Sequence, residues 1–312
     1  MLDKKNNNNK STGDSDRVLI PVDFSPKGSL ALNVGFELAR RLGKKVTLIH
    51  ASVIANPNLF PQFPDDFNGM DNEDAEIEEM ELEQEISTID RDSMAKLKKH
   101  LNSLKNQGLL PDIEYDSIIA PGTPEEVIAE FCAMTPPAVI VMATRGKQKR
   151  QEELIGSVTA EVIDHCLAPV FTVPEHFTFS GFKEIVRICA FCNFDEGDVE
   201  TVKRLMEMFD NPKVKIFLFP ASHKMKGTQR AEALEKIKNK LQNDYPNAEF
   251  FIDAATESNN LRQQIEGLFV KEDIQMILAP NRKRNALSRF LNPGLAHKIL
   301  YETDFPILDI PV

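Results

Sequence analysis

A short stretch after an apolar run carries residue types suited to holding a phosphate. Ala143-Thr144-Arg145-Gly146 follows the run 138–142, nine residues intervene, and Gly156-Ser157 then opens a helical pattern. A glycine at 146 lets backbone N–H groups approach phosphate oxygens, because no Cβ stands in the way. The free N–H groups and the dipole of a helix that begins at Gly156-Ser157 favour an anion, and Ser157 adds a hydroxyl donor. The spacing therefore predicts an anion site between a strand and a helix.

Asp23 is the second candidate for polar chemistry. It follows the apolar run Arg17–Val22, and Ser25-Pro26 comes next as a typical helix start. Ligands of open α/β sheets bind beyond the carboxyl ends of the strands. Asp23 is therefore expected at the same edge as Gly146.

The loop between the glycines is basic, and two interpretations of it stay open. Arg145, Lys147, Lys149 and Arg150 either neutralise phosphates or are solvated without a ligand. Neither a Walker P-loop nor a G-x-G-x-x-G turn is present, so those two nucleotide folds are disfavoured.

A catalytic set is missing from the sequence. The six histidines are scattered without metal-ligand spacing, and no G-x-S-x-G elbow occurs. His50 ends a strand-like run and is read as a core residue. We therefore expect no catalytic residues and no metal site, and at most a slow ATPase activity.

The elements that position these residues occur twice in the chain. Apolar runs with matching neighbours recur in the same order in both halves: Arg17–Val22 and Ile185–Phe191, Lys45–Ser52 and Lys215–Ser222, Ala138–Ala143 and Ile274–Ala279, Ala168–Pro174 and Phe305–Val312. Continuous apolar runs are typical of parallel strands covered on both faces, and helical patterns lie between them. Strands alternating with helices predict an α/β fold with an open, doubly wound sheet in each half.

These features together resemble the universal stress protein family. Its nucleotide-binding members carry Gly-x-x-Gly, nine residues and Gly-Ser at this place, and this chain departs only at Ala143. The opening Pro21-Val22-Asp23-x-Ser25 is also similar to that family's first strand. The resemblance implies tandem five-stranded Rossmann-like domains of the adenine nucleotide alpha-hydrolase type. It also implies an ATP site, with or without Mg²⁺.

Within that resemblance, Pro21 and Val22 would form the adenine wall and Asp23 would bind the ribose or the adenine edge. The candidate nucleotide-binding residues are Pro21, Val22, Asp23, Ala143, Arg145, Gly146, Gly156, Ser157 and Val158. Ala143 is tolerable in place of glycine if its φ is negative.

The second half is expected to have lost this site. Aligning Ala143 with Ala279 puts Arg282 opposite Gly146, Asn292-Pro293 opposite Gly156-Ser157, and Cys192 opposite Asp23. Proline has no N–H, and arginine does not replace glycine where backbone touches phosphate. The basic residues Arg282, Lys283, Arg284 and Arg289 either attract some other anion or form a solvated loop.

The predicted organisation is a disordered tail at residues 1–16, a first domain at 17–176 and a second at 182–312. In this family, domains pair through their last strands, so Val170–Val173 and Ile307–Ile310 are expected to lie antiparallel and form a pseudo-dimer. Such pairing covers two sheet edges that otherwise invite aggregation. Whether two chains form a homodimer stays open.

The net charge of −11 is concentrated in one place. Asp65–Glu85 holds eleven acidic residues and no basic one, within an insertion at about 56–85 of the first domain. It is read as a solvated acidic face, or alternatively as a docking site for a basic protein partner. Without this segment the charges balance at 37 to 37, so nucleic acid is not an expected partner.

Other classes are excluded by composition. No apolar run reaches about 18 residues, so no membrane span is expected. The four cysteines and the absence of a signal pattern suggest a reduced, cytoplasmic protein. Cys189 and Cys192 are read as two buried thiols on opposite faces of a strand.

Two functions follow as hypotheses. The first is a stress-response regulator that binds ATP through its first domain only, with little or no turnover. The second is a scaffold that binds no nucleotide and acts by docking a partner. The stress signal and the partner are not readable from the residues.

Overall fold

The structure is a computed structural model. It describes residues 15–25, 28–52, 91–144, 157–220, 227–252, 261–281 and 305–312. The predicted tail up to residue 14, the acidic insertion at 56–85, and the basic loops at 145–150 and 282–289 lie outside the described residues.

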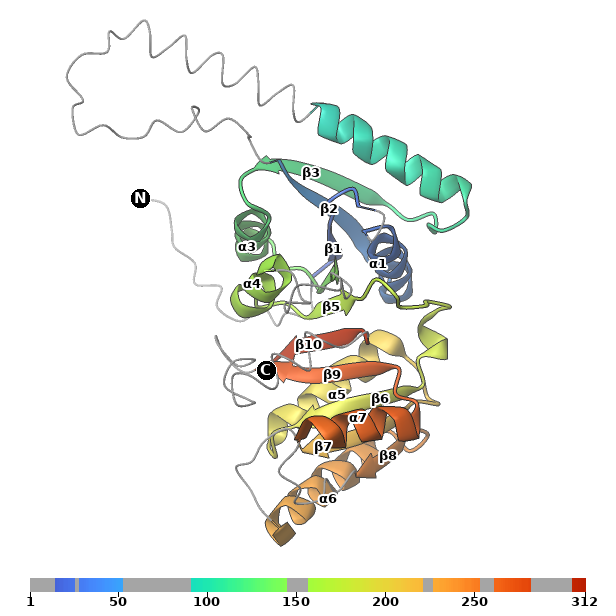
Figure 1. The fold of residues 1–312 in the computed structure, drawn as a ribbon, viewed down its shortest axis with the longest axis vertical. Coiled ribbons are helices and arrows are strands. Elements are labelled where there is room, and N and C mark those ends of the chain that lie inside the picture. The colour runs from blue at the N-terminus through green and yellow to red at the C-terminus, as the bar shows by residue number, and fades with distance from the viewer. Residues whose placement is uncertain are drawn as a thin grey trace, which may run out of the picture.

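The described strands form one mostly parallel sheet (Figure 1). They are β1 (Arg17–Pro21), β2 (Lys45–Ser52), β3 (Tyr115–Pro121), β4 (Val139–Ala143), β5 (Val170–Val173), β6 (Arg187–Cys192), β7 (Lys215–Pro220), β8 (Glu249–Ile252), β9 (Met276–Asn281) and β10 (Ile307–Pro311). Their order across the sheet is β3-β2-β1-β4-β5-β10-β9-β6-β7-β8. The order in the first half therefore recurs, mirrored, in the second.

The helices alternate with the strands along the chain. They are α1 (Gly28–Leu42), α3 (Pro124–Met134), α4 (Ser157–His165), the short 3-10 helix η2 (Phe182–Glu184), α5 (Glu196–Phe209), α6 (Gly227–Asp244) and α7 (Leu261–Glu272). A further helix covers residues 91–106 before β3. None of these described helices is long and apolar enough to cross a membrane.

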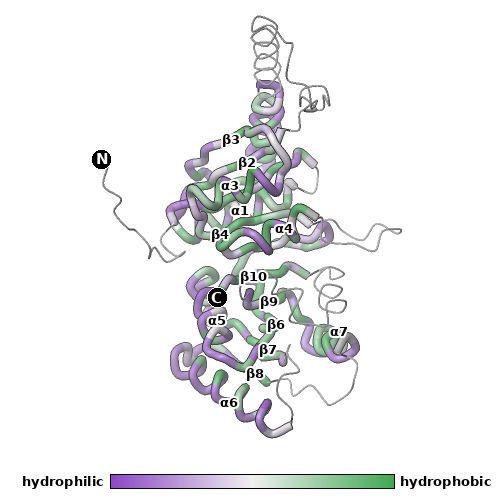
Figure 2. The backbone as a smooth tube through the Cα atoms, turned by 90° about the vertical axis from the view of Figure 1, so that its left-hand side faces the viewer, coloured by the Kyte–Doolittle hydropathy of each residue, from purple (hydrophilic) through white to green (hydrophobic). Residues whose placement is uncertain are grey.

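Helices cover both faces of the sheet. One apolar core runs through both halves and joins alternate strand residues to α1, the helix at 91–106, α5 and α6. The other strand residues pack against α3 and α4 in the first half and against α7 in the second. Figure 2 shows α7 on the far side of the strands from α5. This layering confirms the expected α/β class.

The two halves meet where the sheet reverses direction. Strands β5 and β10 are antiparallel, with Leu308 opposite Phe171 and Asp309 opposite Val170. This is the pairing expected for residues 170–173 and 307–310. The segment after β5 adds Phe182, which is 1% exposed and lies with its ring centroid 6.0 Å from Phe171 and 4.8 Å from Phe209. The connection between the halves is therefore part of the core.

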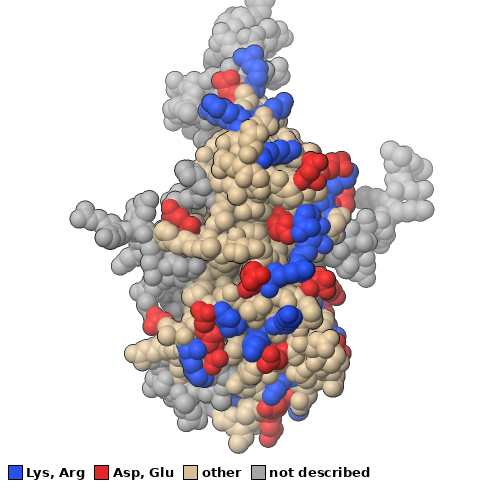
Figure 3. All heavy atoms as spheres, turned by 90° about the vertical axis from the view of Figure 1, so that its right-hand side faces the viewer, with Lys and Arg blue, Asp and Glu red and all other residues tan. Residues whose placement is uncertain are grey.

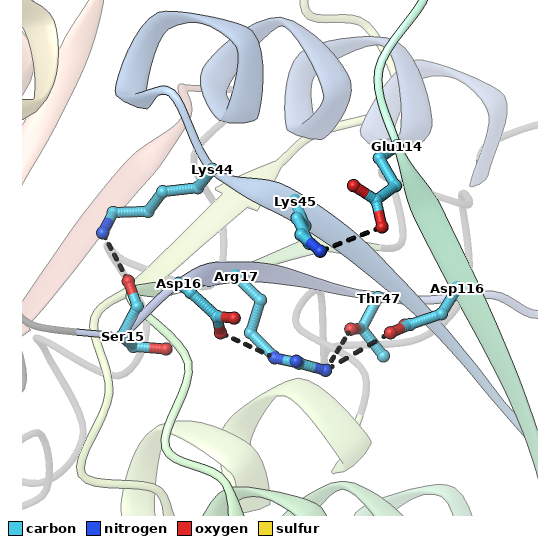
Figure 4. Close-up of polar contacts among 8 residues, drawn as sticks. All are labelled: Ser15, Asp16, Arg17, Lys44, Lys45, Thr47, Glu114 and Asp116. Carbon is cyan, nitrogen blue, oxygen red and sulfur yellow. Dashed lines mark hydrogen bonds and ion pairs between the residues drawn. The ribbon is translucent and has the colours of Figure 1, made fainter.

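Polar contacts hold the amino ends of the first strands in register (Figure 4). Arg17 binds Asp16 at 3.0 Å and reaches Thr47 on β2 at 3.1 Å. Lys45 pairs with Glu114 at 2.9 Å. This edge of the sheet is opposite to the one where ligands of such folds bind, so the network is structural.

Candidate functional site

A cavity of about 260 Å³ lies at the carboxyl edge of the first half. Its walls come from the ends of β1, β2 and β4 and from the first turns of α3 and α4. The lining includes Pro21, Val22, Asp23, Met142, Ala143 and Val158, together with Val127 and Ile128 of α3. Apolar walls with a few polar groups at one edge are typical of small-molecule sites.

The turn after β1 places Asp23 at the mouth of this cavity. One carboxylate oxygen of Asp23, Oδ1, accepts the N–H of Ser25 at 3.0 Å. Among the described residues no hydrogen bond engages the other oxygen, and the residue is exposed. Phe24 follows with a positive φ of 57°, which turns the chain sharply into α1. The carboxylate is thus anchored at one oxygen and available at the other.

Gly28 provides the space that Asp23 occupies. A Cβ at Gly28 would lie 3.0 Å from Asp23 Oδ1, closer than most Cβ contacts. The Gly28 N–H also donates to Ser25 Oγ at 3.1 Å, which is the capping bond expected of Ser25. Pro26, expected in the first helical turn, lies outside the described residues.

His50 is a cavity residue that the sequence prediction assigned to the core. Its Nδ1 donates to the Val22 carbonyl at 2.6 Å, so this nitrogen carries the proton. The ring packs against Phe24 with centroids 4.4 Å apart, and it lines the cavity. His50 therefore supports the β1 turn from within the lining of the cavity. The apolar run around it gave no signal that it would face a cavity.

Helix α3 is fixed at the cavity by its cap. Thr123 accepts the N–H of Glu126, and the Glu126 side chain accepts the N–H of Thr123. These two bonds form a capping box, which Thr123 followed three residues later by Glu126 favours. Pro124 at the first helical position lines the cavity, and Val127 is buried behind it. The cap thus sets where the apolar wall begins.

The structure brings together some of the predicted binding residues. Pro21, Val22, Asp23, Ala143 and Val158 all line the cavity. Ala143 is a strand residue and is not among the residues with positive φ, so alanine is tolerated there. Helix α4 begins at Ser157 as expected, but the side chain of Ser157 lies outside the part of the chain that the structure describes. Arg145, Gly146 and Gly156 lie outside the described residues.

The faces of the strands and the backbone of the turns correct the alignment of the second half. Val18 faces the same core as Ile188, and Phe24 and Phe194 share a positive φ, so Val18 corresponds to Ile188. Because Val18 pairs with Val139 and Ile188 pairs with Met276, Ala143 corresponds to Pro280. The same count puts Asn193, not Cys192, opposite Asp23. Phe194 shares the positive φ of Phe24, at 69°. The apolar run alone did not reveal which residue ends the strand.

In the second half the corresponding turn is closed by Asp198. This residue corresponds to Gly28, and its buried carboxylate accepts the N–H groups of Asn193, Phe194 and Asp195 at 2.7 to 3.2 Å. Burial raises the pKa of Asp198 to about 6, against the lowering effect of these N–H donors. A side chain of the protein thus fills the space that Gly28 leaves open.

The described lining of the cavity offers a ligand few polar groups. Asp23 is the carboxylate among the residues that line the cavity, and no described cluster of His, Cys, Asp or Glu could hold a metal ion. Figure 3 shows basic and acidic side chains intermingled over the face that it draws. The first turn of α4 at the cavity offers helix N–H groups to an anion.

Comparisons with known proteins agree with this fold. The model of the universal stress protein family matches residues 15–174. Universal stress protein MJ0577 of Methanocaldococcus jannaschii is 27% identical over 160 residues, which is 50% of this chain and 93% of that protein.

Solved structures resemble the chain over almost its full length. A universal stress protein from Archaeoglobus fulgidus has a TM-score of 0.66 at 14% identity, covering 96% of this chain and 99% of that one. The Pseudomonas aeruginosa protein PA1789, of unknown function, has a TM-score of 0.55 at 11% identity, covering 96% and 94%. These likenesses concern the fold.

Proposed function

The chain belongs to the universal stress protein family, and from that premise we propose that it is a stress-response regulator that binds one ATP in its first half. The observation that carries the proposal is the cavity at the carboxyl edge, where Pro21, Val22, Asp23 and Ala143 meet the first turn of α4. The base would lie against the apolar wall of Pro21 and Val22, and Asp23 would accept from a ribose hydroxyl. The phosphates, with or without Mg²⁺, would extend toward Gly146, Gly156 and Ser157.

We further propose that the two halves, 17–176 and 182–312, are tandem domains of this family that pair as a pseudo-dimer. The mirrored strand order, the antiparallel β5 and β10, and the shared positive φ at Phe24 and Phe194 support this interpretation. Pairing within one chain leaves no need for a second copy to cover the β5 edge.

The second half is proposed not to bind ATP in this mode. Asn193 replaces the carboxylate of Asp23, and Pro280 stands opposite Ala143. Asp198 occupies the place of Gly28 and already accepts the N–H groups of the turn.

Calorimetric titration with Mg-ATP tests the single site. The intact protein should bind about one ATP per chain, and Asp23→Ala should weaken binding roughly 10- to 100-fold, since a charge-assisted hydrogen bond contributes about 1.5–3 kcal/mol. Asn193→Ala, at the corresponding position of the second half, is the matched control and should bind as the wild type does. Binding lost equally in both variants would contradict a single site in the first half.

The same samples distinguish the rival functions. Little or no phosphate should be released, since Asp23 alone, placed against the ribose, does not activate a water at the phosphates. Phosphate release that Asp23→Ala abolishes would establish a slow ATPase. No ATP binding by the intact protein would instead favour the scaffold that docks a partner.

A further inference from the structure

One described helix carries many more basic than acidic side chains. The helix at 91–106 precedes β3, the last strand at one end of the sheet, and lies at the outer end of the first half (Figure 1, teal). Its one acidic residue is Asp92, and its basic residues, all exposed, are Arg91, Lys96, Lys98, Lys99 and Lys105. Five basic residues and one acidic residue give the helix a net charge of +4. These five basic side chains are called the basic face below.

The other side of this helix holds it to the first half. Leu97, Leu101 and Leu104 are buried in the apolar core. His100 Nε2 lies within hydrogen-bond distance of Ser29 Oγ in α1, at 3.3 Å. The basic face is therefore presented to solvent by a helix whose position the domain fixes.

The basic face has no acidic partner within the described part of the chain. Lys105 lies over the ring of Tyr115, 5.1 Å from its centroid. Among the described residues, no carboxylate forms an ion pair with the other four members, Arg91, Lys96, Lys98 and Lys99. Like charges three or four residues apart on a helix, such as those of Lys96 and Lys99, destabilise it. An acidic ligand on this face would remove that repulsion.

The complementary charge lies in the same chain, five residues before this helix. Asp65–Glu85 holds eleven acidic residues and no basic one, and this segment lies outside the described residues. The buried positions 93, 97, 101 and 104 are spaced by four or three residues, and Ile89 and Ile86 continue that spacing toward the acidic segment. The sequence pattern therefore predicts that the helix continues through 86–90. A continuous helix does not reverse its direction, so the acidic segment would extend away from the basic face of its own chain.

We propose that two copies of the chain associate antiparallel through this region, with the acidic segment 65–85 of each copy on the basic face of the other. In each chain the acidic segment comes first and the basic helix second. Antiparallel copies therefore place opposite charges together at both contacts, whereas parallel copies would place like charges together. The two contacts are identical and are related by a two-fold axis near residue 88, the midpoint of 86–90. Such a self-complementary interface closes the assembly as a dimer.

This interface is separate from the junction of the two halves and from the cavity. Strand β3 ends the sheet, whereas β5 and β10 lie side by side at its middle. None of the five side chains of the basic face lines the cavity of the first half. The dimer therefore does not depend on the proposed ATP site, and its failure would leave the proposal for that site unaffected.

Sedimentation velocity of the full-length protein tests the dimer. A monomer–dimer equilibrium is expected at about 0.1 M salt and a monomer at about 1 M salt, because the Debye length falls from about 10 Å to about 3 Å. At the lower salt, the dimer dissociation constant should rise roughly tenfold or more in the triple variant Lys96→Glu, Lys98→Glu, Lys99→Glu. The matched control, which should dimerise as the wild type does, changes three exposed lysines elsewhere: Lys213→Glu, Lys236→Glu, Lys240→Glu. A wild type that stays monomeric at the lower salt, or equal losses in both variants, would overturn the proposal.

A mixture of two variants distinguishes contact between copies from contact within one chain. The second variant makes the acidic segment basic through Glu73→Lys, Glu76→Lys, Glu78→Lys, Glu79→Lys, Glu81→Lys and Glu83→Lys. Alone, it should be monomeric, because basic groups then face the basic helix of the other copy. Mixed with the Lys96, Lys98 and Lys99 variant, it should form a heterodimer, because both contacts again join opposite charges. Two monomers in the mixture would overturn the antiparallel pairing.

Discussion

Single residues distinguish two turns that share one backbone path. Asp23-Phe24-Ser25 follows β1 and Asn193-Phe194-Asp195 follows β6, and both contain a phenylalanine with positive φ. In the first turn a glycine leaves the carboxylate of Asp23 exposed. In the second turn Asp198 binds the backbone N–H groups from within. Very few side chains therefore decide whether the turn at the carboxyl edge of each half is open to a ligand or filled by the protein itself.

Gly28→Ala should weaken ATP binding without unfolding the protein. The new Cβ would lie 3.0 Å from Asp23 Oδ1, so the carboxylate must move from the position in which Ser25 holds it. We expect the Kd for Mg-ATP to rise roughly tenfold, which is about 1.4 kcal/mol, in a calorimetric titration. Gly267→Ala is the control, because a Cβ there meets nothing within 4 Å. An unchanged Kd in Gly28→Ala would show that ATP binding does not depend on the position of the Asp23 carboxylate.

Asp198→Ala should destabilise the protein by about 3 kcal/mol. The substitution leaves the N–H groups of Asn193 and Phe194 buried without their acceptor, and each such group costs about 1–3 kcal/mol. Urea unfolding would measure the change, and Glu196→Ala, on the exposed side of the same helix turn, should have almost no effect. Similar losses in both variants would mean that the carboxylate does not hold the turn.

At the scale of elements, the cap of α3 links local sequence to the cavity. Thr123→Ala removes the acceptor for the Glu126 N–H and should lower the free energy of unfolding by about 1 kcal/mol. Because Pro124 and Val127 line the cavity, a frayed first turn should also loosen the apolar wall. Urea unfolding and hydrogen exchange of the first turn would measure both effects. Glu130→Ala, exposed on the same helix, should change neither.

Much of this element pattern was predictable from the residues. The apolar strands depend on local composition, and their predicted positions hold to within about two residues. The opposite faces of Cys189 and Cys192 follow from strand geometry and are confirmed. Five of the predicted binding residues line the cavity.

What was not predictable depends on register and on distant packing. The equivalence of Asn193 to Asp23 required the strand faces that point to the shared core and the positive φ of Phe24 and Phe194, which the residue types do not reveal. The place of His50 beside Val22 and Phe24 depends on how separate elements meet. The sequence around His50 offered only an apolar setting.

At the scale of the whole molecule, Phe182 should matter to both halves. Its ring packs against Phe171 of β5 and Phe209 of α5, so Phe182→Ala opens a cavity where the halves meet. We expect a loss of about 3–5 kcal/mol in urea unfolding. Leu167→Ala, 72% exposed, should change stability by less than about 0.5 kcal/mol. A loss in Phe182→Ala no larger than that would mean that the connection between the halves contributes little.

A buried acid also lies at the junction of the halves. Asp309 of β10 is 2% exposed, and its Oδ1 accepts from Asn281 Nδ2 at 2.9 Å. The same Asn281 nitrogen donates to the carbonyl of Ile163 in α4 at 3.1 Å. Burial is the main cause that raises the pKa of Asp309 to about 7, and the charge of Asp164 adds to it. This carboxyl therefore favours its neutral form in the folded protein.

Because the pKa of Asp309 is raised in the folded protein, ionisation of this carboxyl destabilises the fold. The pKa of Asp309 is 3.8 in the unfolded chain and about 7 in the folded protein. The contribution of this carboxyl to the free energy of unfolding is therefore complete below pH 3.8 and is lost as the pH rises through about 7. Asp309→Asn keeps the acceptor for Asn281 and does not ionise. Relative to this variant, the wild type should lose stability between about pH 4 and 7, by up to about 4 kcal/mol at about 1.4 kcal/mol per pKa unit.

Urea unfolding of both proteins across this pH range measures the difference. Asp164→Asn should reduce the total loss of stability only slightly, because burial contributes more to the raised pKa of Asp309 than the charge of Asp164 does. Parallel profiles for the wild type and Asp309→Asn would contradict a neutral carboxyl at the junction. A difference that grows as the pH rises would mean that the junction between the halves, and the end of α4 that Asn281 holds, weaken as Asp309 ionises.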